Sequence, residues 1–385
     1  MTRPLRLLTI GHSYSVDVNR RLAHAIQRAS AGRWNVTVGA PTYFAGRNDI
    51  RPSILKLNPD EPCEVRPIPT LFTRQVHTFF YRNPIRSLLQ EGWDLVHAWE
   101  EPFILAGWQI SRHVPATTPF VFRTAQSLPK RYPLPFRRFE NSTVQRAVGW
   151  ICSGQKVETN LLARPHYADR PHAIIPLGVD TETFRPDSAA RAAILQQLGW
   201  ADDGVPVIGY LGRFVPEKGI AMLLRVLDRL TIPWRAVFLG GGPLEKMITS
   251  WSEKHSDRVR ILTMVAHNEV PNYMSAFDVL TMPSQTTFRW AEQFGRAIVE
   301  AFAAGVPVIA SDSGEIPNVL RGSGMILPES DETAWLNGVT DLLGDPARRH
   351  KMAEEGRERS LQEFDWSVVG GKHIEFFDSL LASRK

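Results

Sequence analysis

The first half of the chain alternates short apolar runs with amphipathic ones. Apolar runs typical of buried strands lie at Leu5–Gly11, Asn35–Ala40, Leu95–Trp99, Phe120–Thr124 and Val148–Ser153. Residues 15–29 carry apolar side chains at helical spacing, which predicts a helix with one buried face. Between about 41 and 80, Pro, Arg and Phe break the pattern, which predicts long loops with room for a short hairpin. Strands alternating with helices favour a parallel sheet with crossover helices.

The pattern restarts after a boundary rich in Pro and Gly, near Ile175-Pro176-Leu177-Gly178. Strands are predicted at Val207–Leu211, Ala236–Leu239, Val259–Leu262, Val279–Met282 and Val306–Ala310. Helices are predicted at about 217–230, 243–255, 270–277, 294–304 and 331–343. At 385 residues, the chain has the length of two domains, which we place at 1–180 and 181–365. Residues 366–385 contain an amphipathic helix that we expect to pack back on the first domain.

The two halves differ in charge. Residues 1–185 hold 24 Lys and Arg against 14 Asp and Glu, whereas residues 186–385 hold 21 against 26. A basic first half favours contact with an anionic partner, such as a membrane surface or a phosphorylated acceptor, and the alternative is a solvated basic surface. We expect no nucleic-acid partner, because no motif for binding DNA or RNA accompanies the charge.

The two cysteines and the N-terminus argue against secretion and metal binding. Cys63 and Cys152 are far apart and lack C-x-x-C spacing, so we expect two buried thiols and no zinc site. The first apolar run is too short for a signal peptide, and no stretch approaches the roughly 20 apolar residues of a membrane span. We therefore expect a cytoplasmic protein, with peripheral contact at the inner face of the membrane.

The first segment with candidate chemistry is Tyr210–Gly219, which follows a strand and opens a helix. Gly212 and Gly219 allow close approach of backbone to a ligand. Arg213 and Lys218 are suited to a diphosphate at a helix N-terminus, although such residues are more often plain surface charges.

The second segment runs from Glu292 to Ala310 and contains a small, apolar helix. Glu300 lies inside the apolar stretch, and a buried carboxylate needs a partner such as the hydroxyl pair of a ribose. If Glu292 were also helical, the two glutamates would be separated by roughly 12 Å along the axis. The amides of Phe294 and Gly295 lie at the helix start, where phosphate or sugar oxygens bind. The alternative is two helix glutamates that face solvent.

Glycine turns at two other strand ends carry weaker signals. Gly240-Gly241-Gly242-Pro243 is better explained as a structural turn than as a phosphate loop, because it lacks the established phosphate-binding spacings. Gly11-His12-Ser13 lacks the glycines of the NAD-binding fingerprint, which argues against an oxidoreductase.

In combination, these segments resemble the retaining glycosyltransferases of family 4. The resemblance rests on the order G-R-x4-K-G, G-G-G-P, P-S and E-Q-F-G-x4-E-A-x-A-x-G-x-P-V-I, preceded by P-L-G-V-D-x3-F-x-P at the domain boundary. It covers the whole second half. It implies an α/β protein of the GT-B fold, with two Rossmann-like domains whose parallel sheets face a central cleft. It also implies transfer of a hexose from a UDP- or GDP-sugar, without metal or other cofactor, to a glycan or lipid-linked acceptor in polysaccharide assembly.

The resemblance assigns roles in the second half. Arg213 and Lys218 would hold the donor diphosphate, with Gly212 beside it. Glu292 would bind the transferred sugar together with the amides of Phe294 and Gly295. Glu300 would bind the ribose, and the backbone around Val265 would contact the base. The turn at Gly11 would lie near the donor phosphates.

The first half departs from the family pattern. Many members carry a His after the strand equivalent to Phe120–Thr124, where this chain has Gln126, which cannot titrate. Glu100 and Glu101 end another strand and are candidates to orient or deprotonate an acceptor hydroxyl, with a plain acidic loop as the alternative. His12 joins them as an acceptor-side candidate, with a structural role as its alternative.

Other functions remain as alternatives to transfer. A non-hydrolysing sugar-nucleotide epimerase would consume donor without an acceptor. A phosphorylase would need pyridoxal phosphate and a suitably placed Lys, which we do not identify. A non-catalytic nucleotide-sugar binder or scaffold is a further alternative, against which the presence of Arg213, Lys218, Glu292 and Glu300 argues.

Overall fold

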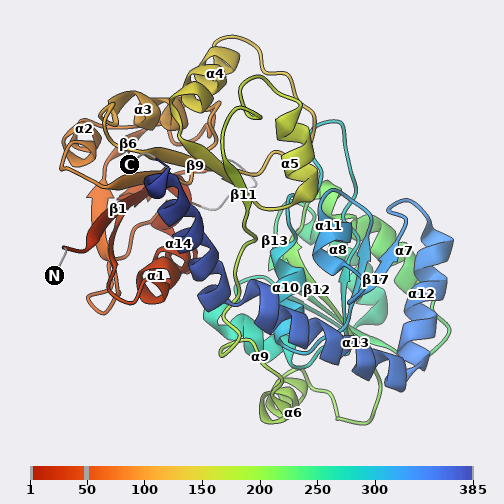
Figure 1. The fold of residues 1–385 in the computed structure, drawn as a ribbon. Helices are drawn as coiled ribbons and strands as arrows, with labels where there is room; N and C mark the ends of the chain where they lie inside the picture. The colour runs from red at the N-terminus through yellow and green to blue at the C-terminus, as the bar shows by residue number, and fades with distance from the viewer. Residues whose placement is uncertain (1–2, 47–51, 384–385) are drawn as a thin grey trace. The chain divides into compact units, whose positions relative to one another are not determined.

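The computed structural model describes residues 3–46 and 52–383, which form two compact units. Unit 1 comprises residues up to Pro176 together with the segment from Trp366 onward, and unit 2 comprises Leu177–Asp365. Each unit is built on one parallel sheet with crossover helices, so the fold class predicted from the alternating pattern is confirmed. Figure 1 shows the helices distributed around these sheets.

Unit 1 contains a seven-stranded sheet in the order β11-β10-β9-β8-β1-β2-β5, parallel throughout. Its strands are β1 (Leu5–Ile10), β2 (Trp34–Pro41), β5 (Glu64–Ile68), β8 (Leu95–Ala98), β9 (Phe120–Thr124), β10 (Gly149–Cys152) and β11 (His172–Ile174). Its helices are η1 (His12–Ser15), α1 (Asp17–Ala29), α2 (Pro84–Leu89), α3 (Leu105–His113), α4 (Phe136–Arg146), α5 (Gln155–Leu162) and α14 (Trp366–Ala382). The central strands β8, β9 and β10 are buried on both faces, which explains their continuous apolar sequences.

The segment from 41 to 81 differs from the loops expected there. It contains two short hairpins, β3 (Tyr43–Phe44) with β4 (Ser53–Ile54) and β6 (Thr70–Leu71) with β7 (Phe80–Tyr81). Between them, β5 adds to the edge of the main sheet beside β2. The strand was missed because its sequence, EVRPI, contains a proline and lacks a clear alternation; proline is tolerated at a sheet edge.

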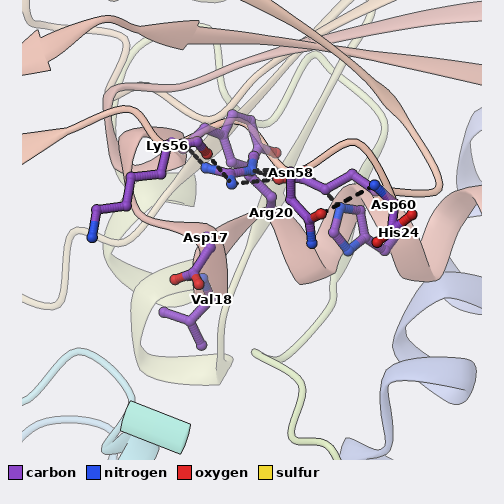
Figure 2. Close-up of polar contacts among 9 residues, drawn as sticks. Asp17, Val18, Arg20, His24, Lys56, Asn58 and Asp60 are labelled. Atoms are coloured by element: carbon purple, nitrogen blue, oxygen red, sulfur yellow. Dashed lines mark hydrogen bonds and ion pairs between the residues drawn. The ribbon is translucent and has the colours of Figure 1, made fainter. Parts of the chain in front are cut away.

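The buried side chain of Arg20 links this segment to α1 through hydrogen bonds. The Arg20 side chain is 1% exposed, and its Nε donates to both carboxylate oxygens of Glu61 at 3.0 and 2.8 Å. Its Nη2 donates to the carbonyl of Lys56 at 3.0 Å, and its Nη1 to the carbonyl of Tyr14 at 2.8 Å. Figure 2 shows Arg20 and His24 projecting from α1 toward the segment that carries Lys56, Asn58 and Asp60.

The long helix α14 packs along α1, and Figure 1 shows the two side by side. The contact is close because Gly370 has no side chain: a Cβ there would lie 2.5 Å from the Ala25 carbonyl oxygen. The buried apolar face of α14 consists of Val369, Ile374, Phe377 and Leu380.

Where α14 meets strands β8 and β9, three polar side chains are buried, and each has a nitrogen without a hydrogen-bond partner among the described residues. They are His97 of β8, Arg123 of β9 and His373 of α14, and the unpartnered atoms are Nε2, Nη1 and Nε2. The two imidazole rings lie 6.2 Å apart, and burial lowers the pKa of His97 well below its usual value and that of His373 to about 3. Both rings are therefore neutral at ordinary pH.

Unit 2 contains a six-stranded parallel sheet in the order β14-β13-β12-β15-β16-β17. Its strands are β12 (Val207–Arg213), β13 (Arg235–Gly241), β14 (Val259–Leu262), β15 (Val279–Met282), β16 (Val308–Ser311) and β17 (Met325–Leu327). Its α-helices are α6 (Ser188–Gln197), α7 (Ile220–Arg229), α8 (Glu245–Ser252), α9 (Val270–Met274), α10 (Arg296–Ala303), α11 (Ile316–Leu320), α12 (Glu332–Gly344) and α13 (Pro346–Arg359). Its shorter helical turns are η2 (Pro216–Lys218), η3 (Glu253–His255), η4 (His267–Glu269) and η5 (Ser360–Phe364).

The two ends of unit 2 are paired with each other. Val179 and Asp365 form a parallel β-bridge, and the Val179 amide donates to the Phe364 carbonyl at 2.8 Å. The Thr181 hydroxyl adds a hydrogen bond to the Asp365 carboxylate at 2.5 Å.

Candidate functional site

The loop after β12 is pressed against the carboxyl end of β15. Gly219 has a φ of +68°, and a Cβ at this position would lie 1.8 Å from the Pro283 carbonyl oxygen, so only glycine fits. The Gln285 amide also donates to the Glu217 carbonyl at 2.8 Å. These backbone contacts fix the turn η2, which carries Lys218.

Lys218 and Glu292 form a largely buried ion pair, with side chains that are 14% and 9% exposed. The Lys218 ammonium donates to Oε2 of Glu292, which also accepts a hydrogen bond from Ser284 Oγ at 3.0 Å. The ammonium lies 4.8 Å from the ring centre of Trp290. The site therefore holds one cation and one carboxylate in a fixed arrangement, each neutralised by the other.

Glu292 belongs to a loop and not to a helix, because α10 begins at Arg296. The separation of roughly 12 Å from Glu300, calculated for a continuous helix, therefore does not apply. The loop is held from behind, since the Glu315 amide donates to the Glu292 carbonyl at 2.9 Å. Gly314 makes this approach possible, because a Cβ there would lie 2.0 Å from the same oxygen.

The start of α10 brings together the other residues predicted for the donor. Gly295 caps the helix with a φ of +86°, a conformation that favours glycine, and Phe294 before it is buried. Glu300 is 5% exposed, and its Oε1 lies 3.9 Å from His267 Nε2 of η4. The interpretation of both glutamates as solvent-facing is wrong, because each is buried with a basic neighbour.

Arg213 is the more accessible of the two cations. Its side chain is 39% exposed, and its guanidinium lies 4.0 Å from the Glu217 carboxylate. It ends β12 directly after Gly212, and the buried Tyr210 hydroxyl donates to its carbonyl at 2.8 Å. Val265 is half-buried and packs against the core of unit 2.

In unit 1, Gly11, His12 and Glu100 come together where β1 and β8 end. The Glu100 carboxylate accepts hydrogen bonds from the His12 amide and from His12 Nδ1, both at 2.6 Å. It also accepts one from the buried Tyr81 hydroxyl at 2.6 Å. Gly11 keeps the turn close to β8, because a Cβ there would lie 3.0 Å from the Trp99 carbonyl oxygen.

Glu101 and Gln126 form a separate group. Glu101 accepts from the Thr124 hydroxyl at 2.5 Å and from the Ala125 amide at 2.9 Å, while Gln126 accepts from the Tyr132 hydroxyl at 2.6 Å. Burial raises the pKa of Glu101, and these hydrogen bonds oppose the rise. The adjacent carboxylates Glu100 and Glu101 are thus directed into different networks.

Trp290 and Tyr81 were missed in the sequence: Trp290 completes the environment of Lys218 and Glu292, and Tyr81 completes that of Glu100. Ser284, part of the P-S pair two residues after β15, was noted in the sequence without a role, and it donates to Glu292. Nothing in the sequence around Tyr81 links it to Glu100.

One known family model matches most of unit 2. Residues 193–359 match the family model of the glycosyl transferases group 1. This region contains Arg213, Lys218, Glu292 and Glu300. Among the described residues, no group of three or more side chains is arranged to hold a metal ion, and no helix has the length and apolar character needed to cross a membrane.

Curated relatives are enzymes that transfer sugars. The GDP-mannose-dependent alpha-(1-6)-phosphatidylinositol monomannoside mannosyltransferase of Mycolicibacterium smegmatis is 35% identical over 55% of this chain and 57% of its own. The D-inositol 3-phosphate glycosyltransferase of Xylanimonas cellulosilytica is 28% identical over 78% of this chain and 71% of its own. The chain spans little more than half the length of the first of these relatives.

Solved structures share the fold over almost the full chain. Sucrose-phosphate synthase of Thermosynechococcus elongatus superposes with a TM-score of 0.73 at 21% identity, covering 99% of this chain and 100% of its own. HepE of Anabaena, in complex with UDP-glucose, superposes with a TM-score of 0.76 at 19% identity, covering 97% and 100%. The chain has the GT-B fold of two Rossmann-like units.

Proposed function

We propose that this protein is a retaining, metal-independent glycosyltransferase that moves a hexose from a nucleotide-sugar donor to a glycan or glycolipid acceptor. The observation that carries the proposal is the ion pair between Lys218 and Glu292, held by Ser284 at the carboxyl edge of the sheet in unit 2. Ligands of open α/β sheets bind at this edge. The pair lies within the region that matches the glycosyl transferases group 1.

The donor diphosphate is assigned to Arg213 and Lys218, which supply two positive charges beside Gly212. The sugar hydroxyls are assigned to Glu292, with the amides of Phe294 and Gly295. A donor would compete with the ion pair, since the diphosphate attracts Lys218 and the hydroxyls donate to Glu292.

The ribose and base are assigned to the second part of the site. Glu300 is buried and can accept hydrogen bonds from two ribose hydroxyls. The backbone around Val265 is assigned to the base.

In the proposed reaction, the acceptor oxygen attacks the anomeric carbon from the side of the departing diphosphate. The bond from the anomeric carbon to the phosphate oxygen breaks with its electron pair on the diphosphate, and the acceptor proton moves to that diphosphate. Arg213 and Lys218 stabilise the negative charge that develops. In oxyanion-stabilising sites, removal of one such group lowers kcat by about 100- to 1,000-fold. No protein nucleophile takes part.

The comparisons support a UDP- or GDP-hexose as donor. One relative is named for GDP-mannose, and the HepE structure contains UDP-glucose. The names of the relatives include a phosphatidylinositol mannoside and an inositol phosphate as acceptors. These names support a glycan or lipid-linked acceptor, which we assign to unit 1 at the strand ends that carry His12 and Gln126, with Glu100 and Glu101 as carboxylates that support them.

The first test is a thermal-shift panel with UDP, GDP, ADP and dTDP and their common hexose derivatives. A ligand at 100 times its Kd should stabilise the protein by about 2.7 kcal/mol. We expect a shift with one nucleotide class in the wild type and none in Glu300→Ala, each measured against its own unliganded protein. Glu355→Ala, which changes an exposed carboxylate of unit 2, is the control and should keep the shift.

The outcomes of the panel separate the alternatives. Donor consumption without an acceptor that ends in an isomeric nucleotide-sugar would favour an epimerase. A nucleotide shift without turnover in any acceptor screen would favour a non-catalytic binding protein. Absence of any shift would contradict the assigned donor site.

We also propose a cytoplasmic location with peripheral contact at an anionic membrane. Unit 1 exposes Phe72 and Leu134, at 69% and 54%, each close in sequence to exposed arginines, Arg74 and Arg131. Apolar side chains beside cations are typical of membrane-surface contacts. Co-sedimentation with vesicles containing phosphatidylglycerol should exceed that with phosphatidylcholine alone, and equal binding to both would contradict the proposal.

A further inference from the structure

Glu100 is a fully enclosed carboxylate whose hydrogen bonds all come from its own unit. It is 1% exposed, and its two oxygens accept from the His12 amide, His12 Nδ1 and the Tyr81 hydroxyl, each at 2.6 Å. Burial raises the pKa of Tyr81 well above its usual value, so the phenol remains a donor. Glu100 is therefore not available to a ligand, and the group it presents outward is His12.

The carboxylate determines the tautomer of His12. Because Glu100 accepts the hydrogen bond, Nδ1 carries the proton, and the neutral ring has its lone pair on Nε2. Nε2 lies on the opposite edge of the ring from Nδ1. The Glu100 side chain is 0% exposed, whereas that of His12 is 27% exposed, so the ring and not the carboxylate is accessible to a ligand.

The turn that carries His12 is rigidly supported. The ring lies 5.1 Å from that of Phe44 and 5.5 Å from that of Phe79, measured between centres. Arg20 donates to the carbonyl of Tyr14 in the same turn while binding the segment around Lys56 (Figure 2). A side chain held by ring contacts and by a hydrogen-bonded turn in this way is suited to accept a directed hydrogen bond.

We propose that Nε2 of His12 binds a hydroxyl group of the sugar acceptor, and that Glu100 is the positioning residue that fixes the required tautomer. This inference rests on the proposed function, which it deepens by assigning the acceptor contact to a neutral imidazole. His12 makes and breaks no covalent bond in the transfer.

The charges around His12 predict how its binding depends on pH. Burial lowers the pKa of His12, but the Glu100 carboxylate, and to a lesser extent Glu101, raise it above the usual value of 6.5. A protonated ring has no lone pair for a hydroxyl. Acceptor binding is therefore expected at high pH and lost as pH falls through this raised pKa.

The first experiment titrates the histidine ring signals of the full-length protein by NMR, with the His12 signal identified by its loss in His12→Gln. We expect a His12 pKa above 6.5, a lower one in Glu100→Gln, and a still higher one in Tyr81→Phe, where the carboxylate loses a competing donor. A His12 pKa below 6.5 that neither variant changes would overturn the dyad. This measurement does not require activity.

The second experiment measures acceptor kinetics with the donor that the thermal-shift panel identifies. We expect His12→Ala to lower kcat/KM for the acceptor at least 10-fold while the nucleotide-induced thermal shift stays the same. His12→Gln keeps an acceptor atom that does not titrate, so it should recover part of the activity and lose the acidic limb of the pH profile. His350→Ala, at an exposed ring, is the matched control.

The two proposals fail in different ways. No nucleotide shift in the wild type would contradict the proposed function, whatever the state of His12. A normal nucleotide shift with wild-type acceptor kinetics in His12→Ala would overturn the inference about His12 alone. Equal loss of activity in His12→Ala and His12→Gln, with an unchanged pH profile, would make the role of His12 purely structural.

Discussion

At the carboxyl edge of the sheet in unit 2, Arg213 is 39% exposed and Lys218 stands beside a single counter-charge, whereas at the same edge in unit 1 Glu100 is enclosed by its own neighbours. Unit 2 thus offers charges that a charged ligand can recruit. Unit 1 uses its carboxylate internally and presents the ring of His12, which is neutral above its raised pKa. The difference matches the chemistry of two substrates, because a nucleotide diphosphate is an anion and an acceptor hydroxyl is not.

The largest expected effect is on the cations of unit 2. Lys218→Ala and Arg213→Ala should each lower turnover by about 100- to 1,000-fold, because each removes a charge that stabilises the departing diphosphate. Steady-state kinetics with the identified donor would measure this, and Lys351→Ala, at a 77% exposed lysine, serves as the control. Near-normal turnover in both variants would contradict the assigned role.

A carboxylate of unit 1 should behave differently when removed. Glu101→Ala leaves the Thr124 hydroxyl and the Ala125 amide without their acceptor, which should cost about 1–3 kcal/mol of unfolding free energy for each group. Urea unfolding would measure the loss, and Glu375→Ala, at an exposed carboxylate of the same unit, should change stability by less than about 0.5 kcal/mol. Unchanged stability combined with lost turnover would place Glu101 with Lys218 and break the contrast between the units.

The two units should also differ in how much stability they lose as pH is lowered. His97 and His373 of unit 1 have lowered pKa values, to about 3 for His373, so the unfolded chain binds more protons than the folded one below the usual histidine pKa near 6.5. Arg123, the nearest charged group, adds to this lowering. Stability present above pH 6.5 should therefore fall between about 6.5 and 3, at a rate approaching 1.4 kcal/mol per pH unit for each ring.

Hydrogen exchange measured across this pH range would locate the loss. As pH is lowered, we expect amides of unit 1, including those of α14, to lose protection at a higher pH than those of unit 2. His373→Asn removes one titrating ring and should flatten the pH dependence. Simultaneous loss of protection in both units, with no change in His373→Asn, would show that other groups control acid unfolding.

The smallest effect tests the packing of α14 with two neighbouring glycines. Gly370→Ala should destabilise unit 1 by about 1–3 kcal/mol, because its Cβ would lie 2.5 Å from the Ala25 carbonyl oxygen. Gly371→Ala meets no atom within 4 Å and should stabilise the helix by up to about 1 kcal/mol. Thermal unfolding of both variants decides this, and equal effects would contradict the close packing of α14 on α1.

The alternation of apolar and amphipathic segments was sufficient to predict most of the two sheets. Strands β9, β14 and β15 have the predicted bounds, because their apolar runs are flanked by clear turn residues. The short edge strands β5, β11 and β17 were missed because three to five residues leave too weak a sequence pattern, although the edge strand β14 was found. Tertiary pairing, and not local preference, makes these segments strands.

The candidate site was less predictable than the fold. The family resemblance implied that Lys218 and Glu292 belong to one site, but their direct contact depends on Gly219 and Gly314, which bring separate loops together. In unit 1, Glu100 and Glu101 were candidates for the same acceptor-side role, with a plain acidic loop as the alternative, whereas the structure directs Glu100 to His12 and Glu101 to Thr124. Side-chain direction at a strand end is set by the surrounding loops, so sequence adjacency is a poor guide there.

The pairing of Val179 with Asp365 has a consequence for how the chain folds. Unit 1 is discontinuous, and α14 must find α1 across more than 300 intervening positions, a closure whose entropic cost grows with the length of the loop. Once unit 2 has folded, its two ends lie side by side, and the intervening chain acts as a short connection. Prior folding of the inserted unit 2 would thus lower the entropic cost of bringing α14 to α1.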